Sequence, residues 1–135
     1  MISQLVLSEM NQALKEIESL PANWDSYGAP PITKAAIKAA RNLLNALVDT
    51  QPDLGDAVRP YSVVPLASGG VQLTWRVVHG VELEVEIGLD GHLGYLLVPT
   101  EGLHHAVEEE DVSQKTVIAM LAKMLGSSPS NHAAD

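Results

Sequence analysis

Two stretches of the chain alternate strictly between apolar and polar residues. The apolar side chains occupy positions 71, 73, 75 and 77 in the first stretch and 81, 83, 85 and 87 in the second. This period of two is typical of strands with one buried face. Placing both apolar sets on the same face predicts a hairpin in which Val77 lies opposite Val81 and Arg76 opposite Glu82. The register leaves residues 78–80 as a three-residue loop with Gly80 in the left-handed conformation.

Three further segments carry apolar residues at three- and four-residue intervals, which predicts three helices. Pro21 ends the first helix, because the residue before a proline avoids the helical conformation, and Thr33 caps the second. Asp111 or Ser113 caps the third helix, which Gly126 ends. The first two helices are expected over residues 3–19 and 34–49.

Two more strands complete the predicted fold. Residues 61–66 form an edge strand, since Pro65 cannot donate to a ladder, and residues 93–98 form a fourth strand after an Asp-Gly turn. We therefore predict a single α+β domain over residues 1–126, followed by a disordered tail at 127–135. The architecture is a two-layer sandwich in which helices cover one face of a four-stranded antiparallel meander, in the order α-α-β-β-β-β-α. An uncovered fourth strand leaves a homodimer open as an alternative.

The net charge of −9 is concentrated in one part of the sequence. Nine acidic residues and no lysine or arginine lie between positions 82 and 111, and the rest of the chain is balanced. Glu82, Glu84 and Glu86 project from one face of their strand at intervals of ~6.8 Å. This surface disfavours direct binding of nucleic acid, which needs a basic footprint, and indicates a protein partner with a basic surface.

The segment "NWDSYGAPPI" between Asn23 and Ile32 has two interpretations. As a structural corner, its Asn and Asp side chains bond nearby backbone, and Trp24 and Tyr27 plug the gap between helices and sheet. As a binding surface, the same aromatic pair is a rigid anchor for another protein. Asp25 is the candidate acid or base of an enzyme if it is buried with a raised pKa, and loses that role if backbone amides hold it.

The same segment carries a resemblance to other proteins. "LPANWDSYGAPPI", followed by "GGVQLTW" and "ELEVEIGLDG", is similar to a group of small uncharacterised bacterial and phage-associated proteins. These proteins share an L-P-x-N-W-D-x-Y-G-A pattern and a later G-G-V-Q-L-x-W strand. The similarity covers about a third of the chain and implies kinship, together with a phage or mobile-element origin. It implies no activity.

Other kinds of site have little support in the sequence. The chain has no cysteine, which excludes disulfides and thiolate chemistry and is expected of a cytoplasmic protein. The N-terminal residues resemble neither a signal peptide nor a membrane span. His104, His105 and Glu108 supply at most half of a metal site. We therefore predict no metal, no cofactor and no catalytic residue.

The sequence favours a small acidic, noncatalytic protein-interaction module, an inhibitor or accessory protein that binds a basic partner. The binding residues expected are Trp24, Asp25, Tyr27, Glu82, Glu84 and Glu86. The alternative is an enzyme or small-ligand-binding domain with a pocket near Trp24, Asp25, Tyr27 and Trp75.

Overall fold

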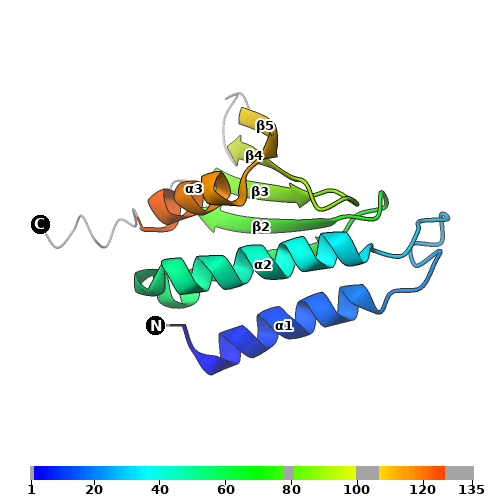
Figure 1. Ribbon diagram of the computed structural model, residues 1–135, viewed down its shortest axis with the longest axis horizontal. Coiled ribbons are helices and arrows are strands. Elements are labelled where there is room, and N and C mark those ends of the chain that lie inside the picture. The colour runs from blue at the N-terminus through cyan, green and yellow to red at the C-terminus, as the bar shows by residue number, and fades with distance from the viewer. Residues whose placement is uncertain (1, 78–80, 100–106, 127–135) are drawn as a thin grey trace, which may run out of the picture.

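A computed structural model describes residues 2–77, 81–99 and 107–126. Within them, one layer of helices packs against one face of a twisted antiparallel sheet (Figure 1). The helices α1 and α2 run side by side in opposite directions, and α3 lies beyond α2. The elements in chain order are α1 (Gln4–Glu18), α2 (Lys34–Thr50), the 3₁₀ helix η1 (Pro52–Val58), β1 (Ser62–Pro65), β2 (Val71–Val77), β3 (Val81–Ile87), β4 (Leu93–Pro99), β5 (Val107–Val112) and α3 (Gln114–Gly126).

The pairing of β2 with β3 confirms the predicted register. Val77 lies opposite Val81, and Arg76 lies opposite Glu82. The conformation expected for residues 78–80 falls outside the described residues. Because side chains alternate between the two faces of a strand, this register turns the intervening glutamates away from the core and buries Val71, Leu73, Trp75, Leu83, Val85 and Ile87.

The core lies between the helices and the inner face of the sheet. The largest buried side chain is Trp75 of β2, which is 1% exposed and donates its Nε1–H to the carbonyl oxygen of Val58 at 2.9 Å. One continuous apolar cluster joins all three α-helices to the sheet. Its sheet members with at most 1% exposure are Val71, Leu73, Trp75, Leu83, Val85 and Ile87.

The helices follow the sequence prediction closely. Ser3 caps α1, and Thr33 caps α2 by accepting the N–H of Ala36 at 3.1 Å. The sequence left Asp111 and Ser113 open as caps of α3. The structure selects Ser113, whose hydroxyl oxygen accepts the N–H of Thr116 at 3.1 Å.

The strand count and the element order differ from the prediction. The sheet has five strands in the order β1-β2-β3-β4-β5, and η1 precedes β1. The acidic segment before α3, which the predicted four-stranded meander leaves out, forms β5 and pairs with β4. β4 is therefore not an edge strand, which removes the basis on which a homodimer was considered. Side-chain pattern alone misses β5, because its glutamates are stabilised in a strand by the backbone of β4.

No helix in the described part of the chain combines the length and the apolar character needed to cross a membrane. The tail expected at residues 127–135 falls outside that part.

The indole hydrogen bond of Trp75 provides a test of the core. We expect Trp75→Phe to lower the free energy of unfolding by about 2–4 kcal/mol, because the smaller ring leaves space and the Val58 carbonyl loses its donor. Tyr61→Phe is the control, since Tyr61 is 60% exposed, and should change stability by less than about 0.5 kcal/mol. Urea denaturation measures both. Equal stability of the two variants would contradict this account of the core.

Candidate functional site

The segment between α1 and α2 is a corner held by its own hydrogen bonds. Asn23 accepts the N–H of Gly28 on its side-chain oxygen at 2.7 Å, and its own N–H donates to the carbonyl oxygen of Ala29 at 2.7 Å. Asn23, Ser26 and Gly28 all have positive φ, at 63°, 67° and 84°. Positive φ is unfavourable for the two non-glycine residues, so these bonds stabilise a conformation that the free chain avoids.

Asp25 belongs to this hydrogen-bond network. Its Oδ1 accepts the N–H of Tyr27 at 2.9 Å and the N–H of Ala29 at 3.1 Å. These two bonds stabilise the carboxylate and hold the pKa of Asp25 below its ordinary value. A carboxyl group that acts as a general acid or base near neutral pH needs a pKa above its ordinary value. The geometry therefore removes Asp25 as a catalytic candidate.

The two aromatic residues of the corner have different environments. Trp24 is half-buried, packs against the core and donates its Nε1–H to the carbonyl oxygen of Pro30 at 2.9 Å. Tyr27 is 92% exposed. The prediction that both rings plug the gap between helices and sheet is thus wrong for Tyr27, because the hydrogen-bonded turn directs its side chain outward. Tyr27 is an exposed aromatic residue on a hydrogen-bonded turn.

The corner is bonded to one end of the sheet. The N–H of Thr33 donates to the carbonyl oxygen of Gly69 at 3.0 Å, and its hydroxyl donates to the carbonyl oxygen of Leu89 at 2.6 Å. Gly70 lies so close to the backbone of Ile87 that a Cβ there would overlap the carbonyl oxygen of Ile87. Gly69, Gly70 and Asn23, which belong to the two distinctive segments of the sequence, therefore have structural roles here.

Glutamates line the face of the sheet that the helices do not cover. Glu82, Glu84 and Glu86 of β3 project there, as predicted, and the sheet register places Leu96 between Glu84 and Glu108 of β5. Arg76 forms the ion pair expected with Glu82, with Nε 3.4 Å from Oε1. We call Glu82, Glu84, Glu86 and Glu108 the acidic face.

Glu84 lies at the centre of the acidic face. Partial burial, followed by repulsion from Glu82 and Glu86, raises the pKa of Glu84 above its ordinary value. The negative charge of Glu84 therefore lowers the stability of the folded protein, and a nearby cation would offset this effect.

A hollow of about 220 Å³ opens on this face beside Glu84. Gly94 of β4 is one of its lining residues and contributes only backbone, close to the backbone of Glu109 and Glu110 on β5. The remaining residues around it are mostly acidic: Glu84, Glu86, Glu108, Glu109 and Glu110, with Tyr95 and Leu96.

The histidine and acidic residues do not assemble into a metal centre within the described ranges. There, no three histidine, aspartate or glutamate side chains are placed to hold one ion. His92 lies beside Asp111, with Nδ1 3.2 Å from Oδ1. His104 and His105, which the sequence analysis considered as ligands, fall outside the described residues.

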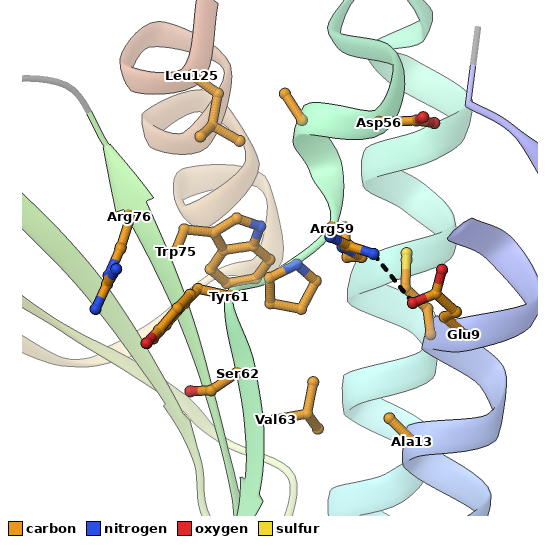
Figure 2. A pocket seen from close by; sticks show the side chains of 13 residues that line it. Glu9, Ala13, Asp56, Arg59, Tyr61, Ser62, Val63, Trp75, Arg76 and Leu125 are labelled. Atoms are coloured by element: carbon orange, nitrogen blue, oxygen red, sulfur yellow. Dashed lines mark hydrogen bonds and ion pairs between the residues drawn. The ribbon is translucent and has the colours of Figure 1, made fainter. Parts of the chain in front are cut away.

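A groove with a volume of about 610 Å³ lies between α1, the start of β1 and the end of α3 (Figure 2). Trp75 and Tyr61 lie at its centre, and the guanidinium of Arg76 stacks on Tyr61 at 3.7 Å from the ring centroid. At the α1 side, Arg59 pairs with Glu9 at 3.0 Å. We call this the Trp75 groove.

The Trp75 groove corrects the predicted position of a pocket. It contains Trp75, but it is not lined by Trp24, Asp25 or Tyr27. The corner follows the last turn of α1, whereas the groove contacts the middle of α1 at Glu9, Met10 and Ala13. Sequence reasoning missed Tyr61, Arg59 and the other lining residues, because they come from segments that only the tertiary fold brings together.

Comparison of the chain with protein-family models, with curated proteins and with solved structures found no match. The resemblance based on the L-P-x-N-W-D-x-Y-G-A pattern thus stays a prediction.

The raised pKa of Glu84 predicts a pH-dependent stability. A carboxyl group whose pKa rises on folding favours the folded state when it is protonated, and this contribution is lost as the pH rises through the folded pKa. We therefore expect Glu84→Gln to melt at a higher temperature than the wild type at neutral pH. The difference should vanish below the ordinary glutamate pKa of 4.5.

Thermal unfolding followed by circular dichroism over a pH series measures this difference. Glu16→Gln on α1 is the control, because Glu16 is an exposed residue of the helical layer. A stabilisation by Glu84→Gln that is independent of pH would contradict the assignment.

Proposed function

We propose that this protein is a small noncatalytic interaction module whose acidic face binds a basic surface of another protein, as an inhibitor or accessory protein does. The observation that supports this most directly is the alignment of Glu82, Glu84, Glu86 and Glu108 on the face that the helices leave open. Lysine and arginine side chains of a partner would relieve the repulsion among these carboxylates. Complementary charge of this kind directs association and raises its rate.

The hollow at Gly94 provides a concave site within the acidic surface. Its volume of about 220 Å³ is suited to the end of one lysine or arginine side chain. Glutamates from β3 and β5 surround it, and Leu96 offers an apolar contact for the aliphatic stem. A bound cation would therefore meet carboxylates from more than one direction.

The corner provides a second contact in this proposal. Tyr27 is 92% exposed on a turn fixed by Asn23 and Asp25, so little conformational entropy is lost when a partner covers it. Thr33 bonds the corner to the turn after β3, at the same end of the sheet as Glu86. In this arrangement Trp24 and Asp25 support the contact and Tyr27 makes it.

The proposal is tested by reversing the charge of the β3 stripe. We expect the triple variant Glu82→Lys, Glu84→Lys and Glu86→Lys to lose the proteins that the immobilised wild type captures from a bacterial extract. High salt, about 1 M, should release the same proteins, because it screens charges. Mass spectrometry identifies what is retained, and lysine- and arginine-rich proteins are expected.

A matched control keeps the total charge change the same. Glu16→Lys, Glu18→Lys and Asp49→Lys reverse three exposed carboxylates of the helical layer, and this variant should capture what the wild type captures. Thermal unfolding of both variants verifies that they fold. Identical capture by all three proteins would remove the acidic face from the proposed function.

The Trp75 groove supports a second candidate function, binding of a small ligand. Its volume of about 610 Å³ lies in the range of ligand sites, and Tyr61 presents an exposed ring beside two arginines. We expect the dye anilinonaphthalene sulfonate, which has an aromatic body and a negative charge, to fluoresce on binding there. Tyr61→Ala should weaken this signal several-fold, whereas Tyr27→Ala, the control at the other exposed tyrosine, should not. Equal signals from both variants would locate the dye elsewhere.

A further inference from the structure

The strand β5 is the last strand of the sheet, and its Glu108 belongs to the acidic face. It pairs with β4, and within the described residues no strand pairs with its other edge. An open edge presents backbone N–H and C=O groups that another extended segment can use. A bulge interrupts the pairing, since the one residue between Leu93 and Tyr95 on β4 lies opposite the two residues between Glu109 and Val112 on β5. The regular part of β5 therefore precedes the bulge.

The sheet register shows which backbone groups point toward the open edge. Gly88 donates its N–H to the carbonyl oxygen of His92, so these two residues form a hydrogen-bonded pair that continues the β3–β4 register. In an antiparallel ladder, hydrogen-bonded pairs recur at every second residue. The N–H and C=O of Leu96, which lies opposite Glu84, therefore point toward β3. Those of Tyr95 then face β5 and its partner Glu109. It follows that the N–H and C=O of Glu108, the next residue along β5, point away from β4.

The charges on β5 determine which segment such an edge accepts. Glu108, Glu109 and Glu110 are all exposed. A second copy of β5 paired at this edge would place carboxylates beside carboxylates, which is destabilising. An extended segment rich in lysine or arginine would instead place its cations beside Glu108 on the acidic face. The edge thus disfavours self-association and favours a basic strand.

We propose that the partner binds by adding an extended lysine- or arginine-rich segment to β5 as a sixth antiparallel strand. This inference rests on the proposed function and specifies how the basic partner is held. Backbone hydrogen bonds at the edge provide affinity, and the alternate side chains that face Glu108 provide selectivity. The partner residue opposite Glu108 directs its N–H and C=O toward β5 and its side chain toward the Glu108 carboxylate.

A short synthetic peptide of alternating lysine and threonine tests this arrangement. In the proposed pairing the lysine residues contribute both the cations and the backbone N–H groups that face β5. N-methylation of the lysine amides should therefore weaken binding by about tenfold or more, since it blocks those donors and leaves the charges intact. N-methylation of the threonine amides is the matched control and should weaken binding much less. Isothermal titration calorimetry measures all three peptides.

Two variants at one position repeat the test from the protein side. Glu108→Pro removes the outward N–H together with the charge, whereas Glu108→Gln removes the charge alone. We expect Glu108→Pro to bind the unmodified peptide about tenfold more weakly than Glu108→Gln. Circular dichroism verifies that both variants fold, and the N-methylated peptides test the proposal on the wild type whatever the proline does.

The outcomes separate this inference from the proposed function. If both N-methylated peptides bind as well as the unmodified one, and binding still depends on salt and on Glu84, the acidic face binds cations and the sixth strand is wrong. If the unmodified peptide does not bind at all, both proposals fail. A dimer seen by light scattering for the wild type and lost in Glu108→Pro would assign the edge to a second copy and overturn the inference.

Discussion

The register between β2 and β3 is the constraint on which the rest of the structure depends. The alignment of Val77 with Val81 places Leu73, Trp75, Leu83, Val85 and their buried neighbours Val71 and Ile87 on the face that the helices cover. The same register turns Glu82, Glu84 and Glu86 to the open face, because neighbouring residues of a strand point to opposite sides. A slip of one residue would bury three carboxylates and expose the core. Core and acidic face are therefore two results of a single alignment.

The corner shows how the segment with the most distinctive sequence serves the fold. Asn23 and Asp25 use their side chains to bond its backbone, and Thr33 bonds it to the turns at Gly69 and Leu89. The low pKa of Asp25 is a consequence of this bonding and speaks against catalysis. The corner leaves the ring of Tyr27 exposed on a turn that these hydrogen bonds hold.

The position of the acidic segment before α3 is set by the sheet and cannot be read from its own sequence. Glu108, Glu109 and Glu110 have no strand pattern of their own, yet pairing with β4 places Glu108 level with Glu84 across Leu96. The acidic residues of β3 and β5 thereby become one surface, with the Gly94 hollow between them. Within residues 2–77, 81–99 and 107–126 no strand pairs with the outer edge of β5, so charge and backbone groups available for pairing lie together there.

Local patterns in the sequence determined the three α-helices with the cap at Thr33, the β2–β3 register, the edge position of β1 and the open-face glutamates, because each depends on periodicity or on neighbouring residues. Only the tertiary structure decided the fifth strand, the exposure of Tyr27 and the Trp75 groove. The fifth strand needs the free edge of β4, and the groove is lined by residues as far apart as Glu9 and Leu125. Such features depend on distances between remote segments, which no local pattern of residues records.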